Sequence, residues 1–108
     1  MPGGTLTYVT HRWSSVPNLS GDPQQVAWRV VDEHVPTRLP RGDYRFQARV
    51  LPRAAVPAQP LEVTGDHETI RGNAAVAIAE AIRRFGEVSL SDLHLSRKVP
   101  YATAARPF

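Results

Sequence analysis

Cysteine is absent from this chain of 108 residues. Its absence excludes disulfides, thiolate metal sites and cysteine nucleophiles together. Lysine is almost absent as well, because Lys98 is the single lysine and the other twelve basic residues are arginines. No apolar run approaches the roughly 20 residues that a membrane-spanning helix needs, and the first residues lack the charged and apolar regions of a signal peptide. We therefore expect a soluble protein of the cytoplasm.

Motifs that carry chemistry are also missing. The chain has no Gly-x-Ser-x-Gly elbow, no Walker loop and no Gly-x-Gly-x-x-Gly turn, so nucleophile, nucleotide and dinucleotide sites have no support. Histidines stand beside acidic residues in segments 32–34 and 66–68, but neither segment has the ligand spacing of a helical metal site. We expect no catalytic residues, no bound metal and no cofactor, and therefore not an enzyme.

The charge is unevenly distributed. Residues 1–82 hold eight basic and eight acidic side chains, whereas residues 83–108 hold five basic and two acidic ones. The whole net charge of +3 therefore lies in the last quarter of the chain. A basic terminal segment on a neutral body favours a polyanionic partner, and its alternative is a solvated basic tail.

Proline divides the chain into two parts. Seven of the ten prolines fall between Pro17 and Pro60, and none falls between Leu61 and Val99. With 42% hydrophobic and 21% charged residues, the composition is that of a globular domain. We expect one domain over 1–108, with a strand-rich part (1–72) and a helical basic part (73–108).

The first part predicts strands and one helix. Alternation of apolar and polar residues predicts a strand at 44–50, and β-branched and aromatic residues predict another at 5–13, followed by a loop over 14–21. Asp22, as N-cap before Pro23, predicts a helix to His34. A glycine-first turn at 65–66 predicts a hairpin of 61–64 with 67–71. At least one of the two tryptophans, Trp13 and Trp28, is expected in the core.

The second part predicts helices. Asn73 as N-cap and Gly86 as C-cap bracket an amphipathic helix over 74–85. Ser89 is expected to begin a second helix that runs to about Lys98, with Val88 and Leu93 as a hydrophobic staple. Pro100 can then open a third helix through Arg106.

The stretch 87–106 resembles the helix-turn-helix of bacterial winged-helix regulators, although it has His94 where that family has a small residue and Lys98 where it usually has glycine. The resemblance implies that 100–106 is the recognition helix and that the protein binds DNA in transcription regulation. The nucleic-acid contacts that it implies are Arg97, Lys98, Tyr101, Thr103 and Arg106.

A second basic surface is predicted on the strand at 44–50. Arg45 and Arg49, with Arg41 before them, recur at the spacing of one strand face, and the alternative is a solvated sheet face. A separate interpretation of the chain is a protein-interaction or assembly module, such as a phage-like structural, adaptor or inhibitor protein, anchored by the apolar residues Val99, Tyr101 and Phe108.

The sequence thus predicts an α+β fold: a small antiparallel sheet of three to four strands packed on one main helix, with a short C-terminal helical appendage. The leading functional hypothesis is a small non-enzymatic nucleic-acid-binding or regulatory protein that uses the basic C-terminal segment. Because so short a sheet leaves free edges, we also expect a homo-oligomer.

Overall fold

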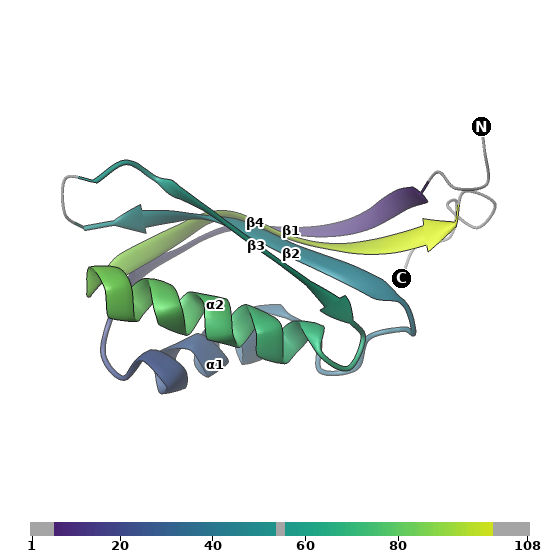
Figure 1. The fold of residues 1–108 in the computed structure, drawn as a ribbon, viewed down its shortest axis with the longest axis horizontal. Coiled ribbons are helices and arrows are strands. Elements are labelled where there is room, and N and C mark those ends of the chain that lie inside the picture. Colours follow the sequence, from purple (N-terminus) through teal and green to yellow (C-terminus); the bar gives the residue numbers. More distant parts are fainter. Residues whose placement is uncertain (1–5, 54–55, 101–108) are drawn as a thin grey trace.

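The protein has two layers, a four-stranded sheet and two helices that cover one of its faces (Figure 1). The computed structural model describes residues 6–53 and 56–100, with side chains described for 15–53 and 56–97. The elements in chain order are β1 (Leu6–Leu19), α1 (Pro23–His34), β2 (Asp43–Pro52), β3 (Gln59–Asp66), α2 (Ile70–Phe85) and β4 (Val88–Pro100). The expected α+β class and antiparallel sheet are confirmed.

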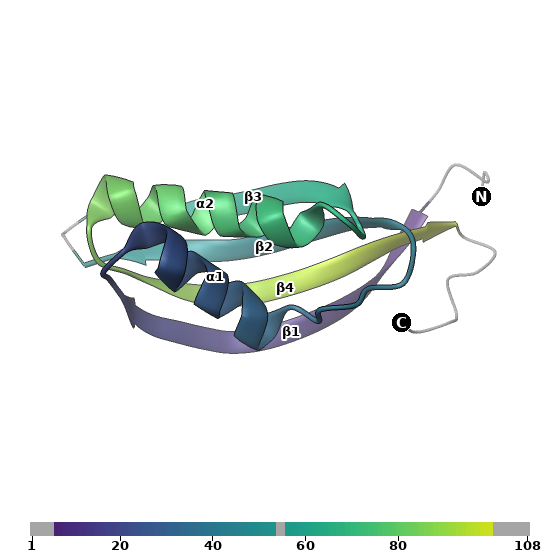
Figure 2. The same cartoon turned by 90° about the horizontal axis from the view of Figure 1, so that it is seen from below.

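The sheet joins the two ends of the described chain. Its strand order is β1-β4-β2-β3, and every neighbouring pair is antiparallel. Each helix therefore connects two strands that have a third strand between them, as in a split βαβ unit. Figure 2, seen from the helix side, shows β3 and β1 at the two edges and α2 along the β3 side. The C-terminal β4 lies in the middle of the sheet, beside β2.

The core lies between the sheet and the helices. In β2, Tyr44, Phe46, Ala48 and Val50 are buried while the residues between them are partly or fully exposed, which confirms the alternation that the sequence predicts. Helix α1 contributes Val30 and Val31, and α2 contributes residues such as Ile78 with no exposed surface. The opposite face of the sheet has no helix of the described chain over it (Figure 1).

Helix α1 begins and ends where the sequence predicts. The Asp22 side chain accepts a hydrogen bond from the Gln25 backbone N–H at 2.9 Å, and Pro23 opens the first turn. The cap satisfies an N–H that would otherwise lack an intrahelical acceptor. The expected core tryptophan is not found on this helix, because Trp28 is 39% exposed. The side chain of Trp13 lies outside the described residues.

Helix α2 begins earlier than predicted, at Ile70 rather than Ala74. The expected hairpin is wrong, because β3 pairs with β2 and residues after Asp66 enter the helix. The Asp66 carboxylate accepts from the backbone N–H groups of Glu68 and Thr69. The Glu68 bond lowers the pKa of Asp66 most; desolvation opposes it, and the two Thr69 bonds and the charge of His67 lower the pKa further. At the other end, Gly86 is the C-cap as expected, with φ at 84°.

The helix expected from Ser89 to Lys98 is also wrong, because this segment is strand β4. Val88 and Leu90 face the core, and so do Leu93 and Leu95, which leaves one extra residue between the two pairs. Asp92 is that residue, with a φ of 52°, and the β2–β4 register shifts across it. Because of this β-bulge, the core-facing residues Leu90 and Leu93 are three positions apart instead of two, which resembles the spacing on one face of a helix. The C-terminal appendage beyond Pro100 lies outside the described residues.

Strand β1 is longer than expected and includes most of the predicted loop. It continues through Ser15, opposite Ser91, to Leu19, opposite Val88, with an irregularity after Val16. Asn18 is accommodated with a φ of 57°. In the part of the chain that the structure describes, no helix is long and apolar enough to cross a membrane.

Candidate nucleic-acid interface

Two basic segments that are far apart in the sequence meet at one end of the sheet. The β2–β4 register places Asp43 opposite Lys98, Tyr44 opposite Arg97, and Arg45 opposite Ser96. Arg41 precedes β2 at the same end. The two basic segments that the sequence predicts separately therefore share one end of the sheet, with Arg45 on its open face and Arg97, opposite the buried Tyr44, on its helix face. We call the residues Arg41, Arg45, Arg97 and Lys98 the basic end.

Arg97 is tied to the loop before β2. Its Nη2 donates a hydrogen bond to the Arg41 carbonyl at 2.9 Å, and it is only partly exposed. Gly42, between the two, has a φ of 154°, and a Cβ added there would come within 3.1 Å of the Arg97 Nε. The glycine therefore gives room for the guanidinium to lie against the loop.

Tyr44 on β2 also holds the loop at 40–42 in place. It is 2% exposed, and its hydroxyl donates to the Pro40 carbonyl. Burial raises the pKa of Tyr44, and the positive charge of Arg97 opposes that rise. The loop at 40–42 is thus held by one bond from β2 and one from β4, so the basic end has a defined shape.

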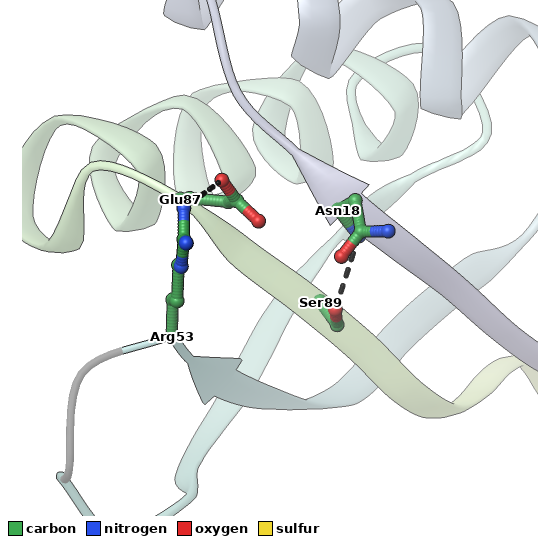
Figure 3. Close-up of polar contacts among 4 residues, drawn as sticks. All are labelled: Asn18, Arg53, Glu87 and Ser89. Carbon is green, nitrogen blue, oxygen red and sulfur yellow. Dashed lines mark hydrogen bonds and ion pairs between the residues drawn. The ribbon is translucent and has the colours of Figure 1, made fainter.

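Three arginines outside the basic end, Arg49, Arg53 and Arg71, are paired with acids. At the far end of the sheet, Arg53 Nη1 lies 3.2 Å from Glu87 Oε1, and the Arg53 backbone N–H donates to the Glu87 carbonyl (Figure 3). In the same region the Ser89 Oγ accepts from the Asn18 N–H at 3.0 Å, which fixes the start of β4 against β1 (Figure 3).

Two further ion pairs join other arginines to acids. Arg49 lies 3.8 Å from Asp92 beside the bulge. Arg71 on α2 pairs with Asp32 on α1 and also lies over the Trp28 ring at 5.9 Å from its centroid. The basic surface predicted on the strand at 44–50 included Arg49. Because Arg49 is paired with Asp92, it contributes less free positive charge than Arg41.

Acidic residues border the basic end on its β3 side. Asp43 and Asp66 face each other across β2 and β3. Together with Glu62 and Arg45 they line a hollow of about 470 Å³. These acids would repel a polyanion, so electrostatics favours polyanion binding on the β4 side of the basic end and disfavours it on the β3 side. Among the described residues, no group of three or more histidine and acidic side chains is placed to hold a metal ion.

Of the contacts implied by the resemblance, Arg97 is described in full and lies in a strand, not near a helix terminus. Lys98 is placed by its backbone between Asp43 and Tyr8, and its side chain lies outside the described residues. Tyr101, Thr103 and Arg106 lie outside them too.

Sequence reasoning missed the contact between Arg97 and Arg41. The contact depends on the pairing of β4 with β2, and the helix expected over 89–98 left no such pairing. Comparison with known proteins finds no matching family model, no matching curated protein and no matching solved structure.

Proposed function

We propose that this chain is a small nucleic-acid-binding protein whose contact surface is the basic end of the sheet. The observation that carries the proposal is the register of β2 with β4, which places Arg41 and Arg45 at the same end of the sheet as Arg97 and Lys98. Phosphate contacts by arginine and lysine supply most of the sequence-independent affinity for nucleic acids. Tyr101, Thr103 and Arg106, which lie outside the described residues, remain the further contacts that the proposal takes from the sequence.

The local structure supports this use of the basic end. The loop at 40–42 is held by Tyr44 and Arg97, so the Arg41 side chain extends from a fixed backbone. An arginine on a fixed backbone loses less freedom on binding a phosphate than one on a mobile loop. The acids that pair with Arg49 and Arg53, Asp92 and Glu87, lie away from this end.

A salt titration of binding to mixed-sequence duplex and single-stranded DNA tests the proposal. Fluorescence anisotropy should give an affinity that falls steeply with salt, with a logarithmic slope of about −0.9 per neutralised phosphate for duplex. Arg41→Gln and Lys98→Gln should each weaken binding and reduce the slope by about one.

The controls remove the same charge elsewhere. Arg29 on α1 and Arg83 on α2 are exposed and lie outside the basic end, so Arg29→Gln and Arg83→Gln should leave the slope unchanged. Equal losses for all four variants would show a diffuse charge effect and contradict the assigned surface. Absence of binding at low salt would contradict the function itself.

A further inference from the structure

Strand β3 forms an edge of the sheet and is bonded to β2 on one side. Between this edge and α2 runs a groove of about 760 Å³. Val76 on the α2 side of the groove is 57% exposed, more than any other large hydrophobic residue of the described chain. The apolar residues that line the groove are Val50, Leu61, Val63, Val76, Ala77, Ala81 and Phe85.

The direction of the free backbone groups follows from one side-chain contact. The Asn73 Nδ2 donates to the Thr64 carbonyl at 2.8 Å, so this carbonyl points away from β2. In an antiparallel ladder, the N–H and carbonyl of one residue point to the same side and the next residue points to the other. Pro60, Glu62 and Thr64 therefore present their backbone outward. Pro60 agrees with this assignment, because a proline here costs no ladder bond to β2.

These three residues offer an unusual set of groups. Glu62 has both a donor and an acceptor, and Pro60 has only its carbonyl. Thr64 has an N–H that needs an acceptor and a carbonyl that Asn73 already satisfies. A pairing strand must therefore bring a spare N–H to Pro60 and a spare carbonyl to Thr64. It must also place no unpaired N–H opposite the Thr64 carbonyl, which Asn73 already satisfies, and no unpaired carbonyl opposite the Pro60 nitrogen, which has no hydrogen to donate.

Strand β3 itself meets these conditions when it runs antiparallel about a two-fold axis at Glu62. We propose that a second copy of this chain pairs there, β3 against β3, so that the four-stranded sheet continues across both copies. Each Glu62 exchanges both backbone bonds with the Glu62 of the other copy. Each Thr64 N–H donates to the other Pro60 carbonyl. The missing proline donor then stands opposite the carbonyl that Asn73 has already satisfied.

The helix layer fits the same arrangement. Helix α2 lies along the β3 side of the sheet (Figure 2), so the pairing brings the two α2 helices side by side. Ala77 and Ala81 line the groove on this side, and small residues permit the helix separation of about 8–10 Å that packed helices adopt. Val76 and the groove floor then lose their contact with water.

Glu62 gives the pairing a charge signature. Directly opposed side chains on hydrogen-bonded strands have Cβ atoms about 5 Å apart. The two Glu62 carboxylates therefore repel, even though Gln47 Nε2 donates to Glu62 Oε1 at 3.1 Å. Glu62→Gln should remove this repulsion and lower the dimer dissociation constant about two- to fivefold.

A mixing experiment distinguishes this axis from other modes of association. Glu62→Lys also opposes like charges in its own dimer, but a mixture of Glu62→Lys with the wild type opposes unlike charges. Native mass spectrometry of the full chains should therefore show more heterodimer than statistical mixing gives. Glu33 on α1 is exposed and unrelated to this edge, so Glu33→Lys mixed with the wild type should give the statistical ratio.

A second variant tests the groove. Val76→Asp should raise the dissociation constant in analytical ultracentrifugation, while circular dichroism reports an unchanged fold. A wild type and a Glu62→Gln variant that both remain monomeric at several hundred micromolar would overturn the proposal. So would a dimer whose mixing ratios ignore the charge at position 62.

Discussion

At the scale of single residues, Tyr44 links the core to the basic end. Its ring is buried in the sheet–helix core while its hydroxyl donates to the Pro40 carbonyl. A hydrogen bond of this kind, here partly buried, contributes about 1 kcal/mol. Tyr44→Phe should therefore lower the free energy of unfolding by about that amount at neutral pH, as measured by urea denaturation.

The same residue sets a pH dependence. Burial raises the pKa of Tyr44 above its ordinary value of 10.0, with Arg97 opposing the rise. The folded state thus favours the neutral phenol, so its stabilising contribution is complete below pH 10 and is lost as the pH rises through the raised pKa. The stability gap between the wild type and Tyr44→Phe should therefore shrink from pH 8 to pH 11. A gap that stays constant would contradict the buried, neutral phenol.

Other residues show where single positions were predictable. Asp22 could be identified as a cap because a helix cap uses only neighbours in the sequence, Pro23 and Gln25. Asp66 was assigned to a hairpin turn instead. In the fold it ends β3 just before helix α2. A hairpin turn and a strand-to-helix turn both use glycine and aspartate for the same local reasons. Which of them forms depends on β2, a partner that the sequence around Asp66 does not contain.

At the scale of elements, the bulge at Asp92 decides the identity of β4. Its φ of 52° is in the region that costs most L-residues about 1–2 kcal/mol and costs glycine little. Asp92→Gly should therefore leave the stability unchanged or raise it slightly, because the exposed Arg49 pair that it removes is weak. Asp92→Val should lower stability by about 1–2 kcal/mol.

Thermal denaturation of both variants, with Asp92→Ala as an intermediate, checks this order. If glycine and valine had equal effects, the left-handed backbone at this position would be wrong. The bulge also explains why β4 was predicted to be a helix. Val88, Leu90, Leu93 and Leu95 all face the core, but the extra residue at Asp92 breaks the period of two by which a regular strand is identified. By contrast β2 has no interruption between Tyr44 and Val50, and its alternation predicted it correctly.

At the scale of the whole molecule, the sheet has two protected strands and two edges. The fold class and helix α1 followed from local patterns. The strand order did not, because it pairs β1 with the last strand of the described chain, with Leu6 opposite Pro100. The basic end depends on that order. It was therefore beyond sequence reasoning, although its arginines were already candidates.

The strand order predicts a pattern of amide exchange. Phe46 in β2 and Leu90, Leu93 and Leu95 in β4 are at most 1% exposed, so amides in these central strands should exchange slowest, by global unfolding. The outward amides of Glu62 and Thr64 in β3 have no ladder partner among the described residues of one copy and should exchange fast at low concentration. Hydrogen exchange followed by NMR measures both groups in one sample.

Concentration then separates the isolated chain from the paired one. Pairing through β3 would give the Glu62 and Thr64 amides new acceptors, so their exchange should slow as the protein concentration rises, whereas central β2 amides should keep their rates. Glu62→Gln should shift this slowing to lower concentration, because it removes the opposed carboxylates. Rates at Glu62 and Thr64 that are independent of concentration, while light scattering reports a dimer, would locate the contact on another surface.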